Sequence, residues 1–134
     1  MRPPKILLVD DDADQRRAVA AVLKGIGEIV EAADGEDALA RIATDRPRLI
    51  LLDVSMPGMG GLEALRRIRK LSPSSTVIML TSESAIESAR EALVAGASAY
   101  VTKPFDIGFL RAEVSRLLEA PRLPTSGAPW RIAP

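Results

Sequence analysis

The sequence of 134 residues contains neither cysteine nor histidine. Without cysteine, the chain has no disulfide, no thiolate nucleophile and no zinc–thiolate site. Without histidine, it has no histidine-based catalytic triad and no imidazole metal ligand. Any general base, nucleophile or metal ligand must therefore come mainly from side chains that carry oxygen.

The sequence also lacks an excess of charge and a long apolar run. Lys and Arg number 18, as do Asp and Glu, and this balance argues against a protein built mainly to grip nucleic acid. The run ILLV at residues 6–9 is far too short for a signal peptide or a membrane span. We therefore expect a cytoplasmic protein with no direct contact to nucleic acid or membrane.

Five short apolar runs are present instead, and each has the length of a β-strand. The first, third and fourth are apolar almost throughout, which is typical of strands covered on both faces of a parallel sheet. The second alternates between polar and apolar residues and predicts an edge strand. In chain order, the five runs are residues 5–9, 28–32, 48–52, 76–80 and 98–102.

Segments with helical spacing separate the runs. The first has an apolar stripe of Val19, Val22, Leu23 and Ile26, and the fifth has one of Leu110, Val114, Leu117 and Leu118. Three predicted helices lie between them, with stop signals at Pro47, Ser72-Pro73 and Gly96.

Strand and helix alternate five times, which predicts a flavodoxin-like, doubly wound α/β fold. A (βα)5 arrangement of this kind has five parallel strands. The order known for flavodoxin-like folds is 2-1-3-4-5, which the alternation does not prove by itself, and sites in such folds lie at the carboxyl ends of the strands. We assign residues 1–120 to this domain. Residues 121–134 include four prolines and no acid, so they are interpreted as a tail or linker.

The predicted strands end in residues that could carry chemistry. Carboxyl ends of parallel strands meet at one edge of a sheet, where crowded carboxylates raise one another's pKa. Magnesium would relieve this, because it prefers oxygen ligands and commonly uses one or two carboxylates. A lysine suits a phosphate oxygen, and the whole set suits phosphoryl transfer. These strand-end residues are Asp10-Asp11-Asp12, Asp53, Thr81-Ser82 and Lys103-Pro104.

Each of these features has a plainer explanation when taken alone. The three consecutive acids could cap the first helix, and Asp12 is the member best placed to do so. Asp53 could cap a turn, while Thr81-Ser82 and Lys103-Pro104 are uninformative on their own. Their coincidence at four strand ends favours a functional site.

Four motifs with this spacing resemble those of the response-regulator receiver domain of bacterial two-component signalling. The resemblance spans residues 5–119 and implies the flavodoxin-like fold and phosphorylation on aspartate. It also implies a sensor histidine kinase or histidine phosphotransfer protein as donor, and a downstream protein effector. The motifs are ILLVDDD, LLDVSMPGMGG, MLTS and YVTKPF.

By position, the resemblance implies a phospho-acceptor and a magnesium site. Asp53 corresponds to the phospho-acceptor, and Asp10 and Asp11 correspond to the acidic pair. Asp11 is the expected direct ligand, while Asp10 acts partly through water. The backbone carbonyl of Ser55 completes the implied ligand set.

The resemblance also implies a switch. Thr81 corresponds to the hydroxyl that moves toward the phosphoryl group. Lys103 corresponds to the cation that forms an ion pair with the phosphoryl group. Tyr100 corresponds to an aromatic residue that turns from solvent toward the core. The bond before Pro104 would be cis.

By position, the resemblance also implies that Ser55 and Glu83 flank the path of the water that attacks the phosphoryl group.

One departure from the family pattern is Gly60-Gly61, where many relatives have an acid before the glycine that opens the third helix.

Other readings stay open. An aspartyl-nucleophile phosphatase or phosphotransferase would usually carry a second carboxylate two residues after Asp53, where this chain has Ser55. A degenerate scaffold receiver would be expected to lose its acids, and here they are intact. We expect no turnover of an external substrate, only the chain's own phosphorylation and dephosphorylation. The chain could be a stand-alone receiver or a piece of a larger regulator or hybrid kinase, and a phosphorylation-dependent homodimer is left open.

Overall fold

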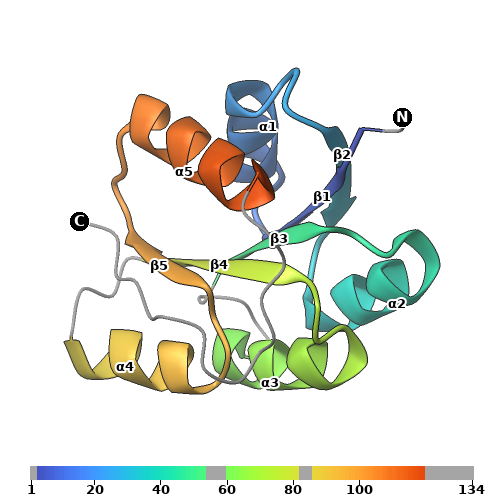
Figure 1. The fold of residues 1–134 in the computed structure, drawn as a ribbon, viewed down its shortest axis with the longest axis vertical. Coiled ribbons are helices and arrows are strands. Elements are labelled where there is room, and N and C mark those ends of the chain that lie inside the picture. Colours follow the sequence, from blue (N-terminus) through green and yellow to red (C-terminus); the bar gives the residue numbers. More distant parts are fainter. Residues whose placement is uncertain (1–2, 54–59, 82–85, 120–134) are drawn as a thin grey trace.

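The computed structural model describes residues 3–53, 60–81 and 86–119. Strands and helices alternate along these segments, as the sequence predicts (Figure 1). The strands are β1 (Lys5–Val9), β2 (Glu28–Ala32), β3 (Leu49–Asp53), β4 (Thr76–Thr81) and β5 (Ala99–Thr102). The helices are α1 (Ala13–Val22), α2 (Gly35–Asp45), α3 (Gly61–Leu71), α4 (Ile86–Val94) and α5 (Ile107–Glu119).

The strands form one sheet in the order β2-β1-β3-β4-β5, and every neighbouring pair is parallel. This confirms the predicted flavodoxin-like topology. The central strand β3 is buried at all five residues. The alternating strand β2 lies at an edge, where only one neighbour covers it. The order of the strands reverses direction between β1 and β3, and the parallel pairing of these two strands places their carboxyl ends side by side.

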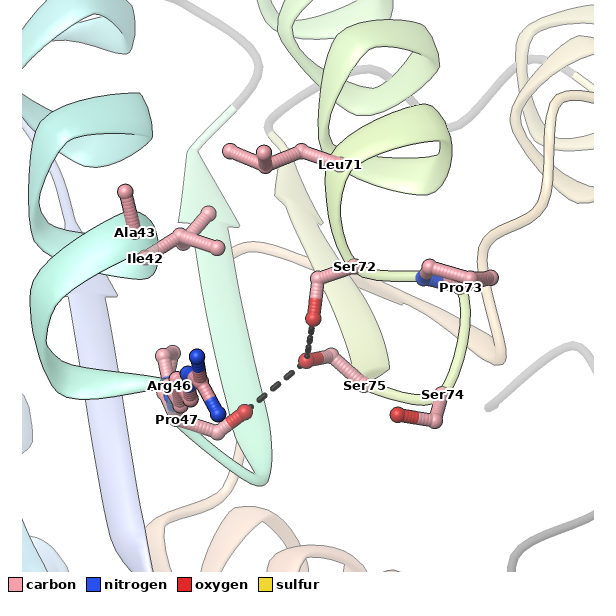
Figure 2. A pocket seen from close by; sticks show the side chains of 9 residues that line it. All are labelled: Ile42, Ala43, Arg46, Pro47, Leu71, Ser72, Pro73, Ser74 and Ser75. Atoms are coloured by element: carbon pink, nitrogen blue, oxygen red, sulfur yellow. Dashed lines mark hydrogen bonds between the residues drawn. The ribbon is translucent and has the colours of Figure 1, made fainter.

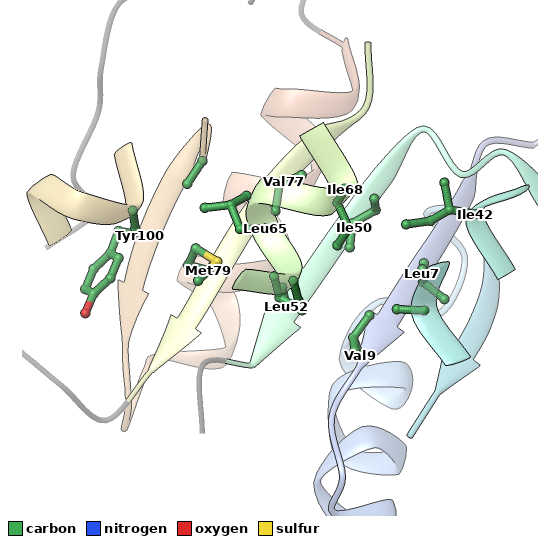
Figure 3. Close-up of a cluster of buried hydrophobic side chains, with 14 of the residues drawn as sticks. Leu7, Val9, Ile42, Ile50, Leu52, Leu65, Ile68, Val77, Met79 and Tyr100 are labelled. Carbon is green, nitrogen blue, oxygen red and sulfur yellow. The ribbon is translucent and has the colours of Figure 1, made fainter. Parts of the chain in front are cut away.

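Helices cover both faces of the sheet: α1 and α5 lie on one face, and α2, α3 and α4 on the other (Figure 1). Leu7 and Val9 of β1 join the core beneath α2, α3 and α4 (Figure 3). Ile6 and Leu8 join the core beneath α1 and α5. Because successive strand residues point to opposite faces, a strand buried on both sides must be apolar throughout.

Helix α1 ends earlier than its apolar stripe predicts. It stops at Val22, and the N–H of Leu23 donates to the carbonyls of Val19 and Ala20. Gly25 then takes φ +90°, a left-handed conformation that glycine adopts without steric cost. Ile26 still packs into the core beneath α1 and α5, but from the loop. The stripe correctly predicted burial and was wrong about helical extent.

The ends of the strands bring polar residues to the carboxyl edge of the sheet. Strands β3 and β4 each run one residue further than predicted, so Asp53 and Thr81 are their last residues. Strand β5 begins one residue later than predicted, at Ala99.

In the part of the chain that the structure describes, no helix has the length and apolarity needed to cross a membrane.

Candidate functional site: a carboxylate cluster at the carboxyl edge of the sheet

Three aspartates converge at the carboxyl ends of β1 and β3. Asp10 follows β1, and its N–H donates to the carbonyl of Ala32, 3.1 Å away. Asp53 ends β3, and Val9 of β1 is aligned with Leu52 of β3. Asp10 is 7% exposed and Asp53 is 4% exposed, whereas Asp11 is exposed. One carboxylate oxygen from each of the three lies within 4.8 Å of the others.

The cluster carries more negative charge than its surroundings neutralise. Burial is the main cause that raises the pKa of Asp10 to about 6, and the charge of Asp53 adds to the effect. The N–H of Asp12, 2.9 Å from Asp10 Oδ1, and the charge of Lys103 oppose the shift only in part. Three hard oxygen donors with residual negative charge fit a divalent cation such as Mg²⁺.

Lys103 brings positive charge to Asp53 from the end of β5. Its Nζ lies 3.3 Å from Asp53 Oδ1 and 2.8 Å from Oε1 of Gln15. Its backbone N–H donates to the carbonyl of Thr81 at 2.6 Å, and the bond from Lys103 to Pro104 is cis. The lysine is thus held from β4, from α1 and from the acidic cluster.

Thr81 and Tyr100 lie on neighbouring strands beside the cluster. Thr81 is 1% exposed and is aligned with Thr102 of β5. Tyr100 is 2% exposed and belongs to the core beneath α2, α3 and α4 (Figure 3). Tyr100 is therefore packed in this core in the structure, and its proposed role in a switch stays a prediction.

The structure brings together most of the residues that the sequence singled out. Asp10, Asp11, Asp53 and Lys103 meet at the sheet edge, and Thr81 ends the adjacent strand β4. Asp12 caps α1 by accepting from the N–H groups of Asp14 and Gln15, the structural role that we had considered for it. Ser55 and Glu83 lie outside the described residues, as does the tail at 121–134.

Two residues at this edge were missed by sequence reasoning. Gln15 accepts a hydrogen bond from Lys103. Arg16 donates from Nη1 to the carbonyl of Asp10, and from Nε to Glu31 Oε1 at 2.9 Å. Their place in the first turn of α1 was a signal that they lie near the cluster. The sequence does not specify which way their side chains turn.

A separate hollow of about 530 Å³ lies at the opposite, amino end of the sheet (Figure 2). It lies between the ends of α2 and α3, over Ile42 and Pro47. Ser75 Oγ donates to the carbonyl of Pro47 at 2.8 Å and lies 2.6 Å from Ser72 Oγ. None of the described residues that line this hollow is acidic, so it does not share the chemistry of the carboxylate cluster.

Comparison with known sequences gives the class to which this fold and site belong. A family model for the response regulator receiver domain matches residues 6–115. Over 107 residues, the chain is 38% identical to the probable transcriptional regulatory protein TcrX of Mycobacterium tuberculosis, covering 79% of this chain and 46% of TcrX. Over 117 residues, it is 39% identical to the response regulator MprA of Mycolicibacterium vanbaalenii, covering 87% of this chain and 51% of MprA. The chain thus spans about half the length of the curated relatives it matches.

Solved structures lead to the same class. The BeF3-activated DrrB receiver domain superposes with a TM-score of 0.82 at 38% identity, covering 90% of this chain and 100% of that one. The chemotaxis protein CheY4 of Vibrio cholerae superposes with a TM-score of 0.79 at 34% identity, covering 86% and 98%. The chain belongs to the response regulator receiver domain family of two-component signalling. Proteins of this class interact with histidine kinases and downstream effectors.

Proposed function

We propose that the chain is a phospho-accepting receiver and that Asp53 is its acceptor. The observation that carries this proposal is the buried Asp53 carboxylate, which lies beside two further aspartates and 3.3 Å from Lys103 Nζ. An oxygen of Asp53 attacks the phosphorus of a phosphohistidine. The P–N bond breaks, the imidazole leaves with the electron pair, and an acyl phosphate forms. The donor is a sensor histidine kinase or a histidine phosphotransfer protein.

The residues around Asp53 fit the charge that develops in this transfer. Asp10, Asp11, Asp53 and the carbonyl of Ser55 would hold Mg²⁺, which supplies charge neutralisation to the phosphoryl oxygens when it is bound. Lys103 is already paired with Asp53 and can follow the new negative charge onto the phosphoryl group.

We also propose that the chain turns over no external substrate. Water attacks the phosphorus of phosphorylated Asp53, the P–O bond to the carboxyl group breaks, and the carboxylate and inorganic phosphate are released. The chain supplies the pocket for its own phosphorylation and its own hydrolysis. Ser55 and Glu83 would flank the path of the attacking water and set the lifetime of the phosphoryl group.

The output would be a change on the surface formed by α4, β5 and α5. The Thr81 hydroxyl moves toward the phosphoryl group, and Tyr100 is the neighbour whose packing responds. An effector or a second phosphorylated copy would bind this surface, on which Val94 of α4 and Ile107 of α5 are exposed. A gap of only a few kcal/mol between the two states is sufficient for phosphorylation to shift their populations. The proposed setting is the cytoplasm.

Acetyl phosphate, a small phosphoryl donor, tests this function directly. Intact-mass spectrometry should show one labile phosphoryl adduct on the wild-type chain in the presence of Mg²⁺. The Asp53→Asn variant should show none, whereas the matched Asp14→Asn variant should behave as wild type, because the Asp14 side chain is 93% exposed. An adduct that persists in Asp53→Asn, or that forms equally well with a metal chelator, would contradict the assignment.

A further inference from the structure

The lysine of the site has two partners, and the closer one is not the acceptor aspartate. Lys103 Nζ lies 2.8 Å from the amide oxygen of Gln15 and 3.3 Å from Asp53 Oδ1. The Lys103 side chain is 18% exposed and that of Asp53 is 6% exposed. In such a sheltered place, an ammonium ion would be expected to lie closest to the carboxylate, because the attraction between opposite charges adds to the hydrogen bond there and is absent at a neutral amide. The observed order of distances therefore needs a cause.

The cause is the position of Gln15 in the first turn of α1. Its backbone N–H donates to the Oδ1 of the capping residue Asp12 at 3.3 Å. The next residue, Arg16, ties the same turn to the carbonyl of Asp10 and to Glu31. The partly buried Gln15 side chain thus starts from an anchored backbone and reaches Lys103, 88 positions away in the sequence.

We propose that Gln15 is a positioning residue for Lys103: its amide oxygen shares the lysine ammonium with Asp53 in the unphosphorylated protein, which limits how far the lysine competes with a divalent cation for the Asp53 carboxylate. This inference rests on the proposed function of Asp53 as phospho-acceptor. A lysine that moved fully onto Asp53 would compete with a divalent cation for the same oxygen atoms. Glutamine suits the task because its oxygen is neutral, so it binds the ammonium without adding a fourth negative charge to the three aspartates.

Replacement of Gln15 by methionine tests the proposal. Gln15→Met keeps the length of the side chain and removes the oxygen, so Lys103 should shift toward Asp53. In the metal-free protein, the NMR resonance of the Lys103 side-chain nitrogen should move. Calorimetry should show Mg²⁺ binding weakened roughly three- to tenfold, the range that the net contribution of one ordinary hydrogen bond gives. The rate of phosphorylation by acetyl phosphate should fall by a similar factor at low Mg²⁺ and recover at saturating Mg²⁺.

Three further variants separate positioning from a general structural effect. Gln15→Glu retains the acceptor oxygen and should bind Mg²⁺ at least as tightly as wild type. Arg17→Met alters the same helical turn at a side chain that is 75% exposed, and it should change nothing. In a Lys103→Met background, Gln15→Met should no longer affect Mg²⁺ affinity, because the residue through which it acts is gone.

The possible failures are distinguishable. If the wild-type chain forms the Asp53 adduct but Gln15→Met binds Mg²⁺ as wild type does, the inference about Gln15 is overturned and the proposed function stands. An equal loss of Mg²⁺ affinity with and without Lys103 would also overturn it. If the wild-type chain neither binds Mg²⁺ nor forms the adduct, both proposals fall.

Discussion

Asp10 and Asp53 lie at the ends of adjacent parallel strands, and each carboxylate is buried within reach of the other. The burial of Asp10, together with the charge of Asp53, raises the pKa of Asp10 to about 6 from a usual value of 3.8. In the absence of a bound cation, this arrangement costs stability. A site that binds a cation can tolerate that cost, because the same unneutralised charge attracts the ion.

The first prediction is that Asp10→Asn stabilises the metal-free protein at pH 7.5, by about 1 to 2 kcal/mol. In the wild type, the folded state binds the Asp10 proton more tightly than the unfolded state does. The contribution of Asp10 to the free energy of unfolding therefore falls as pH rises from 3.8 to about 6, and the loss is complete above that window. The variant lacks this fall. Urea unfolding in chelator at pH 5 and at pH 7.5 measures it, with the exposed Asp14→Asn as control. Equal pH dependence in Asp10→Asn and wild type would contradict the prediction.

The second prediction concerns the switch. Thr81→Ala should leave Asp53 able to accept a phosphoryl group. Phosphorylation should no longer change α4 and β5, because the hydroxyl that moves toward the phosphoryl group is gone. On addition of beryllofluoride, amide NMR signals of residues 89–97 and 99–102 should shift in wild type and shift much less in the variant. Thr76→Ala, at the other end of β4, is the matched control and should respond as wild type does. Shifts confined to the surroundings of Asp53 in the wild type would show that the chain does not signal through this surface.

The third prediction concerns Gly96, which has φ +116° and lies against Arg69. A Cβ at Gly96 would lie 2.5 Å from the Cγ of Arg69, whose Nη1 is held by the carbonyl of Pro73 at 2.9 Å. Gly96→Ala should therefore lower the free energy of unfolding by about 2 to 4 kcal/mol, from backbone strain and overpacking together.

Gly25 provides the matched control for Gly96. It also has a positive φ, +90°, but a Cβ there would meet nothing within 4 Å. Gly25→Ala should cost only the backbone term, about 1 kcal/mol. Chemical denaturation of both variants separates strain from contact. Equal losses would show that Arg69 yields to the added methyl group at no cost.

The fourth prediction concerns the start of α3. Gly60 caps this helix without a side-chain hydrogen bond, in an extended conformation with φ −66° that any residue can adopt. A Cβ at Gly60 would meet nothing within 4 Å. Gly60→Ser should add a cap and raise the free energy of unfolding by a few tenths of a kcal/mol, about 0.3. Gly60→Ala adds a methyl group without an acceptor oxygen, so urea unfolding should show no gain. A gain of equal size in both variants would rule out capping as its source.

The sequence by itself determined the fold class and the edge of the sheet at which the candidate residues meet, whereas the strand order was an expectation taken from known folds of this class. Apolar runs such as 49–52 are typical of strands buried on both faces, and helical spacing marks the crossovers between them. Local polar signals were equally direct. Asp12 caps α1, as considered from the sequence, because a carboxylate can accept the free N–H groups of a first helical turn. Since parallel strands end at a common edge, the convergence of Asp10 and Asp53 followed from topology alone.

Only the tertiary structure decided how the side chains at that edge pair. Gln15 and Lys103 are 88 positions apart, and their contact depends on where the first turn of α1 lies relative to the end of β5 and on how each long side chain turns. The burial of Tyr100 likewise depends on the packing of α4 against β5, which no local pattern encodes. Periodicity and capping are properties of short segments, so they can be read along the chain. Distances between side chains on different elements are set by the packing of the whole domain, and they become visible only when it has folded.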